Sequence, residues 1–123
     1  MNLLASLLFG FLYGIMENRL FFEANLDEWI LKHFRTYHLY MLTIFVLACR
    51  DANAVLWTGN VLLSLLVQNV TWWFIQWHWF GWKPRPDVWD NWGGLPLVFN
   101  VFWWWWAFGI MGIVLQIVGG MIV

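Results

Sequence analysis

Five acidic and histidine side chains are the strongest candidates for binding a divalent metal ion. Carboxylates and imidazoles are ligands that divalent metals accept. His33 and His38 are five residues apart, which separates them by about 140° on a helix. Metal ligands that share one helix commonly use an interval of three, as in Glu-x-x-His sites. A metalloenzyme is therefore the least favoured interpretation, and its ligands would come from Glu17, Glu23, His33, His38 and His78.

A second set of polar side chains recurs along the apolar run 54–80 and at the residue before it. On an ideal helix these side chains fall within about 80° of arc. A polar group facing lipid without a partner is costly, so this face must meet protein or water. It either forms hydrogen bonds between helices, each worth about 0.6 kcal/mol on average, or lines a path for a proton or small solute. Only one member of the set titrates, His78, which favours hydrogen bonds between helices over a transport path. The set is Asn53, Asn60, Ser64, Gln68, Thr71 and His78.

Glu17 is the one acidic side chain near the end of the apolar run 1–22. Its helical phase places it on the face that carries the small residues of this run, whereas Arg19 falls well away and can extend to the lipid headgroups. Acids inside membranes are usually paired. We expect Glu17 to point toward a neighbouring helix and to pair with Arg35 or His38.

Two series of small or polar residues recur at intervals of four, which is typical of helices that pack closely in membranes. Small residues let two backbones approach until van der Waals contact holds them together. The sequence therefore predicts one packing seam in each terminal run: Ser6, Gly10 and Gly14 in the first, and Gly112, Gln116 and Gly120 in the last.

Four consecutive tryptophans, 103–106, point in four directions on a helix. Packing against neighbouring helices is the favoured explanation. The alternative is a flat apolar ligand, such as a quinone or a pigment, stacked on the indole rings. The sequence identifies no specific cofactor.

Composition indicates which surroundings these residues occupy. Of the 123 residues, 63% are hydrophobic and 11% are charged. A soluble domain carries about 25% charged residues, so the exterior of this chain is predicted to face lipid. The net charge of -1 argues against nucleic acid as a partner, because it provides no attractive field.

The hydropathy pattern predicts an all-α polytopic integral membrane protein, a bundle of four transmembrane helices in one domain, residues 1–123. A helix of about 20 apolar residues crosses the hydrocarbon core, and these runs are too long for barrel strands. The first run has no basic segment before it and no cleavage site, so we expect a retained span. The predicted spans are 1–22, 34–49, 54–80 and 95–123.

The basic residues predict the orientation of these spans. Loops 23–33 and 81–94 lie on the same side, and that side collects Arg19, Lys32, Arg35, Lys83 and Arg85, whereas the other side has only Arg50. Positive charges are retained in the cytoplasm. We therefore expect both loops to be cytoplasmic and both termini to be extracytoplasmic, in a multi-pass protein of the cell membrane.

Three functions follow from these features. The favoured one is a small tryptophan-rich, non-catalytic membrane subunit or assembly partner of a larger complex. The alternative is a small homo-oligomeric transporter or channel for a proton or small solute, which would use Glu17 and the polar face of 54–80. The third is the intramembrane metalloenzyme. The expected partners are the lipid bilayer and either other membrane subunits or further copies of this chain.

Overall fold

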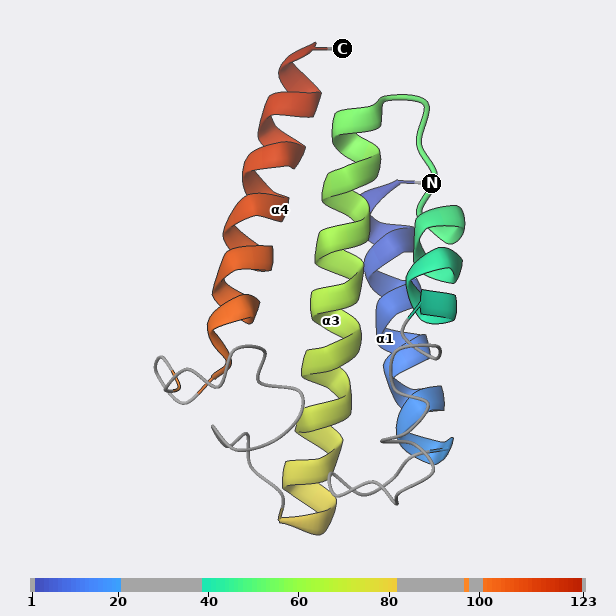
Figure 1. Ribbon diagram of the computed structural model, residues 1–123, viewed down its shortest axis with the longest axis vertical. Helices are drawn as coiled ribbons and strands as arrows, with labels where there is room; N and C mark the ends of the chain where they lie inside the picture. The colour runs from blue at the N-terminus through green and yellow to red at the C-terminus, as the bar shows by residue number, and fades with distance from the viewer. Residues whose placement is uncertain (1, 21–38, 82–96, 98–100, 123) are drawn as a thin grey trace.

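A computed structural model describes residues 2–20, 39–81, 97 and 101–122 of the chain (Figure 1). Four helical segments lie within these residues: α1 (Leu3–Leu20), a shorter helix (Leu39–Ala48), α3 (Ala54–Phe80) and α4 (Trp103–Ile122). The all-helical class expected from the sequence is therefore confirmed for the part of the chain that the structure describes.

The ends of α3 are set by local side-chain and backbone chemistry. Asn53 is the N-cap, and its Oδ1 accepts hydrogen bonds from the amides of Val55 at 2.9 Å and Leu56 at 3.3 Å. Such a cap satisfies amides that have no partner inside the helix. Gly81 ends the helix with a φ of 73°, a left-handed conformation that glycine adopts without steric cost. As a result, α3 has the same bounds as the predicted third apolar run.

Alpha3 is the central helix of the bundle. Figure 1 shows α4 on one side of α3, with α1 and the Leu39–Ala48 helix on the other. Successive helices run in alternating directions, so α1 and α3 are parallel. Contacts between them keep a constant offset, since Gly10 lies against Ser64 and Gly14 lies against Gln68. This register brings the predicted small-residue face of α1 onto α3.

Two of the described helices are long and apolar enough to cross a membrane by length and composition, Ala54–Trp79 and Trp103–Met121. The apolar segments Leu3–Asn18 and Leu39–Ala48 are shorter. The predicted runs 1–22 and 34–49 both extend into residues outside the described part. Four complete spans therefore remain a prediction.

The last helix begins later than its apolar run suggested. The sequence predicted a span from residue 95, but Val101 and Phe102 are not helical and α4 starts at Trp103. Phe102 is fully buried, and its ring lies 5.4 Å from that of Trp73. An apolar run is equally suited to a buried non-helical segment, so hydrophobicity alone placed this boundary too early.

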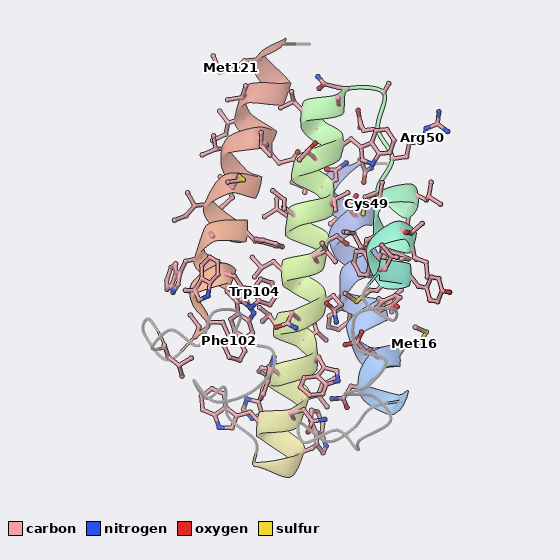
Figure 2. All side chains as sticks on the ribbon, viewed as in Figure 1. Met16, Cys49, Arg50, Phe102, Trp104 and Met121 are labelled. Atoms are coloured by element: carbon pink, nitrogen blue, oxygen red, sulfur yellow. The ribbon has the colours of Figure 1, made fainter. Side chains whose placement is uncertain are left out.

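The buried apolar side chains form two clusters at different heights along α3, and Phe108 of α4 packs against both. One joins Trp72 and Trp73 of α3 to Phe102 and Trp104, which Figure 2 places between α3 and α4. The other contains Phe45 and Cys49, together with Val61 and Leu65 of α3. In this second cluster the ring of Phe45 lies 5.0 Å from Phe9 and 4.9 Å from Tyr13. Edge-to-face aromatic contacts of this kind stabilise beyond the burial of their area.

Candidate functional site

The polar face predicted on α3 is mostly buried inside the bundle. Asn60 is 1% exposed, Ser64 is fully buried, and Gln68 is 3% exposed. Thr71 is also buried, and its hydroxyl donates to the carbonyl of Val67 at 2.7 Å. His78, in the last turns of α3, is exposed. The structure therefore brings the middle of the predicted face together inside the protein and leaves its last member on the surface.

Ser64 joins α3 to α1 at the narrowest point of their contact. Its hydroxyl donates a hydrogen bond of 2.6 Å to the carbonyl of Ser6. A Cβ atom built on Gly10 would lie 2.9 Å from Ser64 Oγ, and one built on Gly14 would lie 2.6 Å from the Gln68 carbonyl oxygen. Only glycine leaves room for such an approach. The small residues predicted to form a seam in the first run do line this contact.

Glu17 and Gln68 form a buried pair one turn further along. The Gln68 Nε2 atom donates to Glu17 Oε1 at 2.8 Å, and Glu17 is 9% exposed. Hydrogen bonds to an ionised carboxylate are about twice as strong as those between neutral groups. The carboxyl thus points toward α3, as its helical phase predicted. The partners expected from the sequence, Arg35 and His38, lie outside the described residues.

Asn60 connects three helical segments. Its Nδ2 donates to the carbonyl of Cys49 at 3.4 Å, and its Oδ1 accepts from Gln116 Nε2 of α4 at 2.8 Å. Gln116 Nε2 also lies 3.4 Å from the carbonyl of Leu56. A buried amide with both ends bonded fixes the relative positions of the helices it joins, because misplacing any one of them leaves a polar group unsatisfied.

The seam on α4 needs a correction at one position. A Cβ built on Gly112 would lie 2.6 Å from Leu63 Cγ, and one built on Gly119 would lie 2.6 Å from Leu56 Cδ2. At Gly120 a Cβ would meet nothing described within 4 Å. Each step of four residues advances about 40° around a helix, whereas seven residues return to within about 20°. The contact after Gly112 and Gln116 is therefore made by Gly119, and Gly120 faces outward.

Several buried polar groups were missed by reading the sequence. Trp105 Nε1 donates to Asn69 Oδ1 at 2.8 Å, and Trp57 Nε1 donates to the carbonyl of Val46 at 2.7 Å. Asn18 Nδ2 lies 3.3 Å from the carbonyl of Trp72. The available signal was chemical, since an indole N–H or an amide inside an apolar run needs a nearby partner. That rule predicts a bond without identifying the partner.

The four consecutive tryptophans have different surroundings. Trp104 is 3% exposed in the aromatic cluster with Trp72 and Trp73, and Trp105 is held by Asn69. Trp106 is 44% exposed. Packing in the aromatic cluster therefore explains the position of Trp104. The hydrogen bond to α3 explains the position of Trp105.

The proposed metal ligands are not brought together where they are described. Glu17 is bonded to Gln68, whereas His78 lies ten residues beyond Gln68, about 15 Å along the helix. The ring of His78 lies 4.2 Å from that of Phe74. Within the described residues there is no group of three or more potential ligands. Glu23, His33 and His38 lie outside them.

No protein-family model, curated protein or solved structure matches this chain. The arrangement of its polar and apolar side chains is therefore the basis for assigning a function.

Proposed function

We propose that this chain is a small non-catalytic integral membrane subunit that assembles with other membrane proteins. The observation that carries the proposal is the inverted distribution of its side chains. Ser6 and Ser64 are fully buried and Gln68 nearly so, whereas Leu4 is 76% and Met121 79% exposed. A lipid environment favours this arrangement, because exposing apolar side chains to lipid costs no free energy. Polar groups in lipid, in contrast, need hydrogen-bond partners inside the protein.

The exposed apolar surface extends over every described helix. Soluble proteins seldom expose apolar patches larger than a few hundred Å². A surface of this kind suits contact with lipid tails or with apolar helices of a partner. Its large members include Leu4, Leu8 and Leu12 of α1, Leu39 and Leu47 of the short helix, Phe74 of α3, and Ile110, Ile113 and Ile117 of α4.

The buried polar groups support a structural role over a transport path. Ser64 is bonded to the backbone of α1, Gln68 to a side chain of α1, and Asn60 to α4 and to Cys49. A solute moving along this face would have to break these bonds in turn, and each break would leave a buried group unsatisfied. The same bonds hold four helical segments in one arrangement.

Alpha4 supports the assembly part of the proposal. It packs on α3 through its glycines, while Met111, Val114 and Val118 on its other sides are 41–56% exposed. A helix that presents so much apolar surface is suited to contacts with a neighbouring subunit.

We also propose the orientation in the cell membrane, with loops 23–33 and 81–94 cytoplasmic and both termini extracytoplasmic. In Figure 1 the two ends of the described chain lie toward the end that carries the turn between the Leu39–Ala48 helix and α3. Arg50 lies in this turn and points away from the bundle in Figure 2. The other basic residues fall in or near the two loops assigned to the cytoplasm, which the positive-inside rule favours.

The mass of the native particle tests the proposed function. The tagged chain is extracted from its own membranes in a mild detergent, purified, and measured intact by native mass spectrometry. A hetero-complex much larger than the 14.8 kDa chain is expected. A particle containing this chain alone would contradict the subunit proposal.

The second candidate function is a small homo-oligomeric transporter for a proton or small solute. The observation in its favour is the buried carboxyl of Glu17 beside Gln68, since an acid inside a membrane often marks an ion pathway. A purified dimer or tetramer that transports protons or a solute would establish it in place of the subunit.

A further inference from the structure

An apolar groove runs between α3 and α4 near the start of α4. Its volume is about 370 Å³, within the usual range of roughly 300–1,000 Å³ for ligand pockets. Leu66 and Val70 form the α3 wall, and Trp105, Gly109 and Ile113 are among the residues that form the α4 wall. From Trp105 to Ile113 the groove follows the helix for about 12 Å.

The groove owes its shape to two fixed features. The indole of Trp105 is tied to Asn69 by a hydrogen bond of 2.8 Å, which holds this wall in place. Gly109 has no side chain, and a Cβ built there would lie 3.3 Å from Leu66 Cδ2. A Cβ at that distance would be in tight contact, so glycine lets the α4 backbone lie directly against Leu66 within the groove lining.

The chemistry of the lining selects the occupant. The surface inside the groove is almost entirely apolar, so a charged headgroup or a ligand that needs hydrogen bonds would lose its solvation without replacement. The lining is eight residues, far fewer than the roughly 20–30 per side in a stable protein interface. A single hydrocarbon chain meets both conditions.

We propose that this groove binds one acyl chain of a membrane lipid. The inference rests on the proposed membrane location. The groove opens beside Trp106 and Ile110, which are 44% and 62% exposed, so a chain lying in it remains continuous with the surrounding lipid. Trp105 and Gly109 both belong to the α4 wall of the site.

Photo-crosslinking tests the site in intact protein. The purified chain is reconstituted in phosphatidylcholine vesicles containing a small fraction of phosphatidylcholine with a diazirine in its acyl chain. After irradiation, labelled peptides are mapped by mass spectrometry. We expect label concentrated on residues 105–113 over the rest of the exposed α4 surface.

Matched variants separate a site from ordinary lipid contact. Val70→Phe fills the groove from the α3 wall, and Val118→Phe makes the same change outside the groove at a similar exposure, 41% against 38%. Labelling of 105–113 should fall about tenfold in the first variant and stay near wild type in the second. Gly109→Ala and Gly120→Ala make the same comparison with a single added methyl group. Labelling of 105–113 should fall in the first variant and stay near wild type in the second.

Two outcomes would overturn the inference, and they are distinguishable from failure of the proposed function. Uniform labelling along α4, or equal labelling in Val70→Phe and Val118→Phe, would remove the groove site alone. Alkaline carbonate extraction is applied first to the same vesicles. If carbonate removes the protein from the vesicles, the proposed membrane location is wrong, and the acyl-chain site fails with it.

Discussion

Gly10 of α1 faces the backbone of Ser64 in α3 so closely that a Cβ on Gly10 would lie 2.9 Å from Ser64 Oγ and closer still to the Ser64 carbonyl oxygen. Backbone cannot move aside as a flexible side chain can. The position therefore sets the distance between two parallel helices, and it leads to the first prediction.

Gly10→Ala should destabilise the protein by about 1–3 kcal/mol, the usual cost of overpacking a tight contact. Gly120→Ala is the matched control, because a Cβ there meets nothing described within 4 Å. The free energy of unfolding of both variants is measured in the same detergent micelles. Equal stabilities would mean that α1 and α3 do not meet as closely as the structure places them.

Gly112→Ala should be tolerated better than Gly10→Ala. The atoms nearest to a Cβ at Gly112 are the side-chain atoms Cγ and Cδ2 of buried Leu63, at 2.6 and 2.7 Å, so this side chain must shift as a whole, whereas at Gly10 the obstacle is backbone. We expect a loss of about 1–2 kcal/mol, smaller than at Gly10 and partly offset by the higher helix propensity of alanine. Thermal melts of the two variants give the order, and a greater loss at Gly112 would contradict it.

The Asn60–Gln116 hydrogen bond should couple α3 to α4. In a double-mutant cycle of Asn60→Ala and Gln116→Ala we expect an interaction energy of about 0.6 kcal/mol and at most about 1.7, as found for such bonds in membranes. Chemical unfolding in micelles supplies the four stabilities. A pair of Ser64→Ala and Gln116→Ala is the control, since these side chains bond to different helices, and additivity in both cycles would argue against the coupling.

Replacing the charge of Glu17 separates the two candidate functions. In the structural subunit, Glu17→Gln should lower the melting temperature and the yield of complex, because the buried carboxyl that accepts the hydrogen bond from Gln68 is removed. Glu17→Asp, which keeps the charge, should recover part of the loss. In a proton-coupled transporter, Glu17→Gln should instead fold normally and lose transport. A wild-type melt and full yield in both variants would contradict the structural role.

A reporter enzyme that works only outside the cytoplasm should be active when fused to the C-terminus, and a reporter that works only in the cytoplasm should be inactive there. The reason is the concentration of basic residues in and near loops 23–33 and 81–94. A fusion within 81–94 is the internal control and should give the opposite result. An active cytoplasmic reporter at the C-terminus would reverse the proposed orientation.

Local chemistry was enough to predict the all-helical class and the extent of α3. The bounds of α3 follow from Asn53, which caps amides at one end, and Gly81, which takes a left-handed conformation at the other. The polar face of α3 and the inward direction of Glu17 also followed from the sequence, because helical periodicity is a property of neighbouring residues. The start of α4 did not follow, since the apolar residues before Trp103 suit a buried non-helical segment as well as a helix.

Only the tertiary structure decided which groups meet. The single polar face of α3 is divided between partners, so that Ser64 and Gln68 bond to α1 while Asn60 bonds to Gln116 of α4. The choice of Asn69 as the partner of Trp105 depends on the rotation of α4 against α3. Such pairings join residues that are tens of positions apart in the chain. They depend on how all helices pack at once, which the periodicity of one segment does not contain.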